Sequence, residues 1–124
     1  MLFMLIFNEM PGDFARRERP AEAPTYWRDW NAYINAMVQA GIVVGGNLLQ
    51  APSTGATVGV VEGRPQRRYG AADAEGAAIG GCFIINVTTL GEALDWAARS
   101  PNVGDGSRGH TEVRPLLPPP PRPA

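Results

Sequence analysis

The sequence contains no lysine, one cysteine and one histidine among its 124 residues. The absence of lysine excludes Schiff-base chemistry through a lysine amine. A single cysteine excludes an internal disulfide. One histidine and one cysteine are too few for the usual zinc ligand sets, so we expect no metal site.

The sequence also lacks a strong net charge and a long hydrophobic run. Eleven arginines and 12 acidic residues give a net charge of −1, which leaves no electrostatic footprint for nucleic acid or an anionic membrane. No apolar run approaches the about 20 residues that span a bilayer, and the opening MLFMLIF lacks the length and the basic flank of a secretory signal. We therefore expect a cytoplasmic protein without a nucleic-acid or membrane partner.

What the chain does have is the composition of one ordinary globular domain, 44% apolar and 19% charged. A domain of this size that needs a buried site often builds it by pairing with a copy of itself, and two-fold dimers are the commonest soluble assembly. We expect a homodimer in which residues 1–116 form the domain and residues 117–124 form a proline-rich tail.

Hydrophobic periodicity and turn residues predict the order βαββαβ with an added β-hairpin. Apolar residues three and four positions apart predict a helix capped by Thr25 and ended by Gly41. Thr89 and Glu92 form a capping box for a second helix, which ends before Pro101. Strands are predicted at 2–7, 42–46, 56–62, 79–87 and 110–116. Loops are predicted at 13–24, a charged surface loop or lid, and at 67–78.

This order predicts an α+β, ferredoxin-like sheet with both helices on one face. The other face then needs a cover, and a second subunit is the natural one. Two such sheets packed face to face would enclose a cleft, and the alternation of side chains along each strand identifies the residues that point into it.

Four stretches together resemble the YCII-related proteins, and specifically the small proteins named for a DGPF motif. They are AGIVVGGNLLQAPSTGATV at 40–58, IGGCFIINV at 79–87, EALDWAARSP at 92–101 and EVRPL at 112–116. The resemblance implies a dimeric α+β barrel with a pocket lined by both subunits. Where the DGPF tetrapeptide should stand, this chain has Tyr69-Gly70-Ala71-Ala72. Some relatives are cofactor-free enzymes with a His-Asp pair, but the first helix here contains no histidine, so that pair is not carried over.

The last strand holds the strongest candidates for chemistry. Alternation sends His110, Glu112 and Arg114 to the face opposite the helices. An imidazole beside a carboxylate suits a general base, and a guanidinium can hold a carboxylate or an enolate oxygen. The alternative is that Glu112 and Arg114 form an interfacial ion pair and that His110 caps the end of the strand.

Further candidates come from the loops and the other strands. Tyr69 and Asp73 stand at the altered signature, where either could act as an acid or donor or be ordinary loop polarity. Trp27 lies off the apolar stripe of its helix and could line an entrance or pack under the charged loop. Cys82 shares the predicted cleft face with Asn86, and the alternative for this thiol is simple packing. Asn86 and Asn47 are candidates for orienting a ligand.

These residues favour a cofactor-free acid-base enzyme of the isomerase, lyase or cyclase type. Its substrate would be a small aromatic or polyketide-like carbonyl compound of specialised metabolism. In this hypothesis His110 is the base, Glu112 orients it, Arg114 and Asn86 polarise an oxygen, and Tyr69 is an auxiliary acid. Two alternatives stay open: a noncatalytic dimer that binds a small molecule or regulates, with the tail as one route of recruitment, and a cofactor-independent oxygenase.

Overall fold

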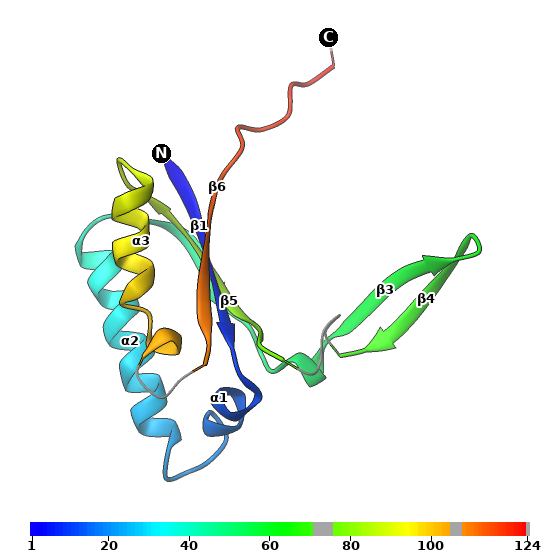
Figure 1. Ribbon diagram of the computed structural model, residues 1–124, viewed down its shortest axis with the longest axis horizontal. Helices are drawn as coiled ribbons and strands as arrows, with labels where there is room; N and C mark the ends of the chain where they lie inside the picture. The colour runs from blue at the N-terminus through cyan, green and yellow to red at the C-terminus, as the bar shows by residue number, and fades with distance from the viewer. Residues whose placement is uncertain (71–75, 105–107, 124) are drawn as a thin grey trace.

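A four-stranded antiparallel sheet carries two helices on one of its faces (Figure 1). The computed structural model describes residues 1–70, 76–104 and 108–123. The strand order is β2–β5–β1–β6, with bounds Val43–Leu48, Ala78–Asn86, Leu2–Glu9 and His110–Pro115. The covering helices are α2, Ala23–Gln39, and α3, Leu90–Ala98. This is the predicted α+β, ferredoxin-like arrangement, and the prediction of fold class is confirmed.

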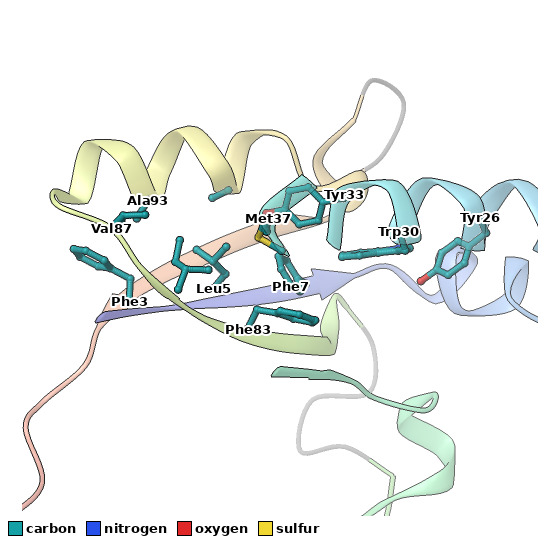
Figure 2. Packing of buried hydrophobic residues seen from close by; sticks show 12 residues of the cluster. Phe3, Leu5, Phe7, Tyr26, Trp30, Tyr33, Met37, Phe83, Val87 and Ala93 are labelled. Carbon is teal, nitrogen blue, oxygen red and sulfur yellow. The ribbon is translucent and has the colours of Figure 1, made fainter. Parts of the chain in front are cut away.

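The core lies between the sheet and the two helices. Residues Phe3, Leu5 and Phe7 of β1 are fully buried because alternate side chains of the strand point to the helical face. The Phe7 ring meets the Trp30 ring edge-on at 5.0 Å between centroids, as Figure 2 shows for this part of the core. Each fully buried side chain of this kind contributes about 1.5–3 kcal/mol through removal from water. The cluster therefore fixes the helices on one face and leaves the other without a cover.

The Thr89 cap predicted for the second helix is present, but the returning bond of the capping box is shifted by one residue. The backbone N–H of Glu92 donates to Oγ1 of Thr89 at 3.2 Å, and Oε2 of Glu92 accepts the backbone N–H of Thr88, the residue before the cap, at the same distance. The first bond satisfies an N–H group that the first turn of α3 cannot pair internally. The sequence therefore places the start of α3 correctly.

The prediction of a loop over residues 13–24 holds for residues 17–22, which are turns, and is wrong at both ends. A short helix, α1, runs from Pro11–Arg16, and α2 begins at Ala23 rather than after Thr25. The carboxylate of Asp13 accepts the backbone N–H of Met10 at 3.0 Å and caps α1. The segment is rich in charge and has no hydrophobic period, so its sequence did not predict the short helix α1 that follows β1.

Two strands stand apart from the main sheet. β3, Ala56–Val61, pairs only with β4, Arg64–Tyr69, and Figure 1 shows the pair extending away from the rest of the molecule. We call residues 56–69 the hairpin arm. The predicted loop at 67–78 is therefore wrong at its start, because residues 67–69 continue the pairing with β3 as far as Ala56. It is also wrong at its last residue, Ala78, which begins β5, and residues 71–75 of this prediction lie outside the described residues. The short 3-10 turns Pro52–Thr54 and Pro101–Val103 complete the elements of the described chain.

Candidate functional site

Opposite the helices, the sheet presents what we call the uncovered face. Residues paired directly across neighbouring strands point to the same side. The register pairs Asn8 with His110, Ile6 with both Glu112 and Cys82, and Met4 with both Arg114 and Ile84. Asn47 is paired with Cys82. The uncovered face thus holds Met4, Ile6, Asn8, Asn47, Cys82, Ile84, His110, Glu112 and Arg114.

One row of the uncovered face crosses the whole sheet. It runs through Asn47, Cys82, Ile6 and Glu112, one residue from each strand. Strands are spaced about 4.8 Å apart, so Asn47 and Glu112 lie about 14 Å from one another across the row.

Cys82, the candidate thiol of this row, is not activated as a nucleophile. Burial raises the pKa of the Cys82 thiol, which disfavours the thiolate that a nucleophile requires.

Asn86 lies at the other end of the sheet from His110. It is paired with Leu2, and its Oδ1 accepts the N-terminal amine of Met1 at 3.2 Å. Asn8, the partner of His110, is six residue steps along β1 from Leu2, which corresponds to about 20 Å. The structure does not bring Asn86 and His110 together within one subunit.

Glu112 and Arg114 form an ion pair on β6. Oε2 of Glu112 accepts Nη1 of Arg114 at 3.2 Å, with the side chains 50% and 68% exposed. A pair this exposed contributes at most about 1 kcal/mol, because water screens it. The carboxylate is thus engaged by the arginine two residues away, and both groups remain accessible from the uncovered face.

A pocket of about 620 Å³ opens at the end of the sheet where β1 finishes. Most of its wall consists of apolar or small side chains, including Leu49, Pro52 and Ile79, and Asn8 contributes a polar group. Asn8 is also the cross-strand partner of His110, so the exposed His110 stands one strand away from the pocket wall and does not itself line the pocket. Pockets that are mostly apolar with a few polar groups are typical of small-molecule sites.

A second pocket of about 440 Å³ lies at the root of the hairpin arm. It shares Pro52 and Gly70 with the first pocket and adds Phe14 and the exposed Tyr69. Tyr69 therefore lines a pocket, but a different one from that lined by Asn8, the strand partner of His110. Asp73 lies outside the described residues.

Behind the pockets is a buried ion pair that the sequence analysis missed. The side chain of Glu9 is 1% exposed and that of Arg17 is 7% exposed, and Oε2 of Glu9 accepts Nη2 of Arg17 at 2.7 Å. Tyr26 donates its hydroxyl to the other carboxylate oxygen and accepts Nε of Arg17 at 2.9 Å. Burial, reinforced by the hydrogen bond to Glu9, raises the pKa of Tyr26 well above its usual range.

Arg17 connects this cluster to the pocket wall. It donates to the backbone carbonyl of Leu49, a pocket residue, and to that of Gly80 at 3.4 Å. Its guanidinium lies over the rings of Phe14, at 4.8 Å, and Trp27, at 5.3 Å. Trp27 is therefore half-buried against Arg17, in the packing position that the sequence analysis gave as an alternative.

A signal for this cluster was present in the sequence. Glu9 has the same parity as Phe3, Leu5 and Phe7, so continuing the alternation of β1 by one step places a carboxylate on the buried face. A buried carboxylate requires a cationic or hydrogen-bonding partner. The charged segment that follows supplies one, Arg17.

No cluster of three or more metal-binding side chains occurs in the described part of the chain. Within the same residues, no helix is long and apolar enough to cross a membrane.

No protein-family model matches the sequence, and no curated protein matches it either. Among solved structures, the chain is similar to 5-chloro-2-hydroxyhydroquinone dehydrochlorinase from Burkholderia phenoliruptrix AC1100, in complex with 2,5-dihydroxybenzoquinone. The TM-score is 0.54 at 16% sequence identity, and the match covers 94% of each chain. At this identity the likeness concerns the fold, and it extends over nearly the whole length of both proteins.

Proposed function

We propose that this protein is a divergent member of the YCII-related, DGPF-type barrels and acts as a cytoplasmic homodimer. Its activity is cofactor-free acid-base catalysis on a small aromatic or polyketide-like carbonyl compound. The reaction is an isomerisation, an elimination or a cyclisation, each of which begins with removal of a proton next to a carbonyl or from a phenol.

The observation that carries this proposal is an apolar pocket whose lining residue Asn8 is paired across the sheet with the chain's single histidine. The pocket of about 620 Å³ is large enough for a substituted aromatic ring. His110 stands next to Asn8 at its edge, and imidazole is the side chain best suited to exchange protons near neutral pH. An apolar wall with a base and an amide at one edge fits a flat carbonyl compound better than a charged metabolite.

Each candidate residue has a role in this proposal. His110 takes the proton, and Glu112 orients the imidazole, which requires the carboxylate to exchange its Arg114 partner when substrate binds. Arg114 then holds the developing oxyanion. Tyr69, which lines the neighbouring pocket, is the auxiliary acid. Asn86 acts on the same substrate only if a partner subunit brings it to the pocket, because it lies about 20 Å away within its own subunit.

The solved neighbour supports the aromatic class of substrate. That enzyme is named for removing hydrogen chloride from a hydroquinone, and it was solved with a benzoquinone bound. Such an elimination needs a base for the proton and a pocket for a flat, oxygen-substituted ring. In this proposal the pocket receives the ring, and His110, the strand partner of the lining residue Asn8, is the base.

The test uses 2,5-dihydroxybenzoquinone as the binding probe and 5-chloro-2-hydroxyhydroquinone as the substrate. Wild-type protein should bind the quinone and release chloride from the hydroquinone. The variant His110→Gln should bind the quinone but lose at least about a hundredfold in turnover, as expected for loss of a general base. Arg28→Ala, on an exposed part of α2, is the matched control and should leave both unchanged.

Failure of the wild-type protein to bind the quinone would contradict the aromatic substrate class. Unchanged turnover in His110→Gln would remove His110 from the mechanism.

A second candidate is a noncatalytic dimer that binds the same class of molecule. The ion pair between Glu112 and Arg114 favours it, because in this arrangement the carboxylate is occupied by arginine. Quinone binding without turnover of any chlorinated hydroquinone would select this candidate.

A further inference from the structure

The two pockets at the root of the hairpin arm have part of their walls in common. Ala51, Pro52, Gly70 and Ala78 line both of them. None of these four residues is larger than proline, so no bulky side chain stands where the two pockets meet. The shared wall is therefore a low boundary between two adjoining spaces.

Gly70 keeps this boundary low. Its φ of +96° lies in the region that glycine adopts readily and other residues rarely do. Its backbone N–H donates to the carbonyl of Gly55 at 2.8 Å, and its carbonyl accepts the hydroxyl of Thr57 at 2.8 Å. Apart from its neighbours in the chain, the only described atom within 4.0 Å of a Cβ built at Gly70 is the carbonyl oxygen of Pro52. The backbone here is thus fixed in place, and the space beside it is open to a ligand.

The two pockets differ away from the shared wall. The first, of about 620 Å³, includes Asn8, the strand partner of His110. The second, of about 440 Å³, is lined by the rings of Phe14 and Tyr69. Phe14 is held by Arg17, whose guanidinium lies 4.8 Å from the centroid of the ring. One pocket therefore lies next to the groups for chemistry, and the other offers aromatic surface against which a second flat group can pack.

Size and charge limit what can occupy this space. The two volumes add to about 1,060 Å³, which is at the upper end of the about 300–1,000 Å³ of small-molecule sites. A single six-membered ring fills only part of it. Among the described residues that line either pocket, none carries a charged side chain, so this wall offers no cation to a phosphate or a carboxylate. The space beyond the first ring suits a neutral, apolar group.

We propose that one substrate spans both pockets. Its oxygen-substituted ring lies in the first pocket beside Asn8, and an aromatic or other apolar extension of the same molecule lies in the second pocket against Phe14 and Tyr69. This inference rests on the proposed function and narrows its substrate class to rings that carry a neutral, apolar substituent. A spanning substrate also brings Tyr69 to the molecule on which His110 acts, as the proposed mechanism requires.

The experiment compares two matched ligands by titration calorimetry, 2,5-dihydroxybenzoquinone and its 3-phenyl derivative. Both carry the same ionisable ring and differ only in the apolar phenyl group. The ratio of their dissociation constants therefore measures what the extension contributes to binding. The wild-type protein should bind the phenyl derivative at least about tenfold more tightly, because the second pocket removes the phenyl surface from water.

Two tryptophan substitutions at exposed positions each fill one pocket. Ser53 lines only the second pocket, and Gln50 lines only the first. Ser53→Trp should bring the ratio of dissociation constants close to one, because the phenyl group loses its place. Gln50→Trp should weaken the binding of both ligands at least about tenfold, because it displaces the ring that they share. Arg28→Ala, on an exposed part of α2, is the control and should match the wild type for both ligands.

Nuclear Overhauser cross-peaks locate the phenyl group directly, and in the wild-type complex they should join its protons to those of the Phe14 ring. Equal affinity of the wild type for the two ligands, an unchanged ratio in Ser53→Trp, or the absence of these cross-peaks overturns the inference and leaves the proposed function standing. A wild-type protein that binds neither ligand overturns both together. Binding in the expected ratio without release of chloride from 5-chloro-2-hydroxyhydroquinone counts against the proposed reaction alone, and the spanning site then stands.

Discussion

Replacing Glu9 by Gln should destabilise the protein more than any exposed charge substitution. The carboxylate is the buried partner of Arg17, 2.7 Å from its Nη2. Removing one member of a buried ion pair leaves the other charge uncompensated, at a cost of about 3–5 kcal/mol. Gln keeps the side-chain volume and one acceptor oxygen, so we expect the free energy of unfolding to fall by about 3 kcal/mol, the lower end of this range. That is a large share of the free energy of unfolding of a typical domain, which is about 5–15 kcal/mol.

The assay is urea unfolding at one fixed protein concentration, because dimerisation makes apparent stability depend on concentration. Thermal unfolding should show a fall in Tm of about 10 °C or more. The control is Glu112→Gln, which breaks the exposed pair with Arg114 and should cost less than about 1 kcal/mol. Both changes replace one carboxylate by an amide in the same sheet. The difference between the two losses of unfolding free energy therefore measures the effect of burying the ion pair.

A double-mutant cycle separates the pair from its surroundings. Arg17→Met alone leaves the Glu9 carboxylate buried without its cation, and Glu9→Leu alone leaves the Arg17 guanidinium buried without its anion, whereas the double variant removes both charges. The double variant should be at least about 2 kcal/mol more stable than the sum of the single effects predicts. If Glu9→Gln unfolds within about 0.5 kcal/mol of wild type, the reasoning about this pair is refuted.

Two further predictions concern the same end of the core. Gly80→Ala should lower the free energy of unfolding in urea by about 1–3 kcal/mol, because a Cβ there would collide with the buried carboxylate of Glu9. The control is Gly45→Ala, which has open space around its Cβ and should change stability little. Equal effects of the two substitutions would contradict the packing at Gly80. Burial raises the pKa of both Tyr26 and Tyr33, so their contribution to stability is complete below about pH 10 and is lost as the pH rises further. In a Tyr69→Phe background, phenolate absorbance should therefore appear together with unfolding, and its appearance in folded protein would contradict this.

Several features of the fold were predictable from local patterns. Alternation along β1 identifies Phe3, Leu5 and Phe7 as the buried side and leaves Met4 and Ile6 for the other face. Thr89 predicts the start of α3, because a capping side chain bonds a backbone N–H only three residues further along the chain. These signals are local, so the tertiary structure does not alter them.

The candidate site was predictable only in part. Alternation places His110, Glu112 and Arg114 on one face, but it says nothing of how far Asn86 lies from them. That distance depends on the register of β5 and β6 against β1. Likewise, the pocket beside Asn8 is formed where the turn after β2 meets the beginning of β5, two segments that are separated in the sequence.

By itself the sequence determined the order of the four sheet strands and of α2 and α3, and the face that β1 buries. It also excluded lysine, disulfide and usual zinc chemistry. Only the tertiary structure decided that Arg17 is buried, that residues 67–69 extend the hairpin arm, and that Glu112 binds Arg114. The physical reason is the distance along the chain between the residues that interact. Periodicity and capping act between near neighbours, whereas a buried charge, a strand register and a pocket depend on which distant segments share the same low-dielectric space.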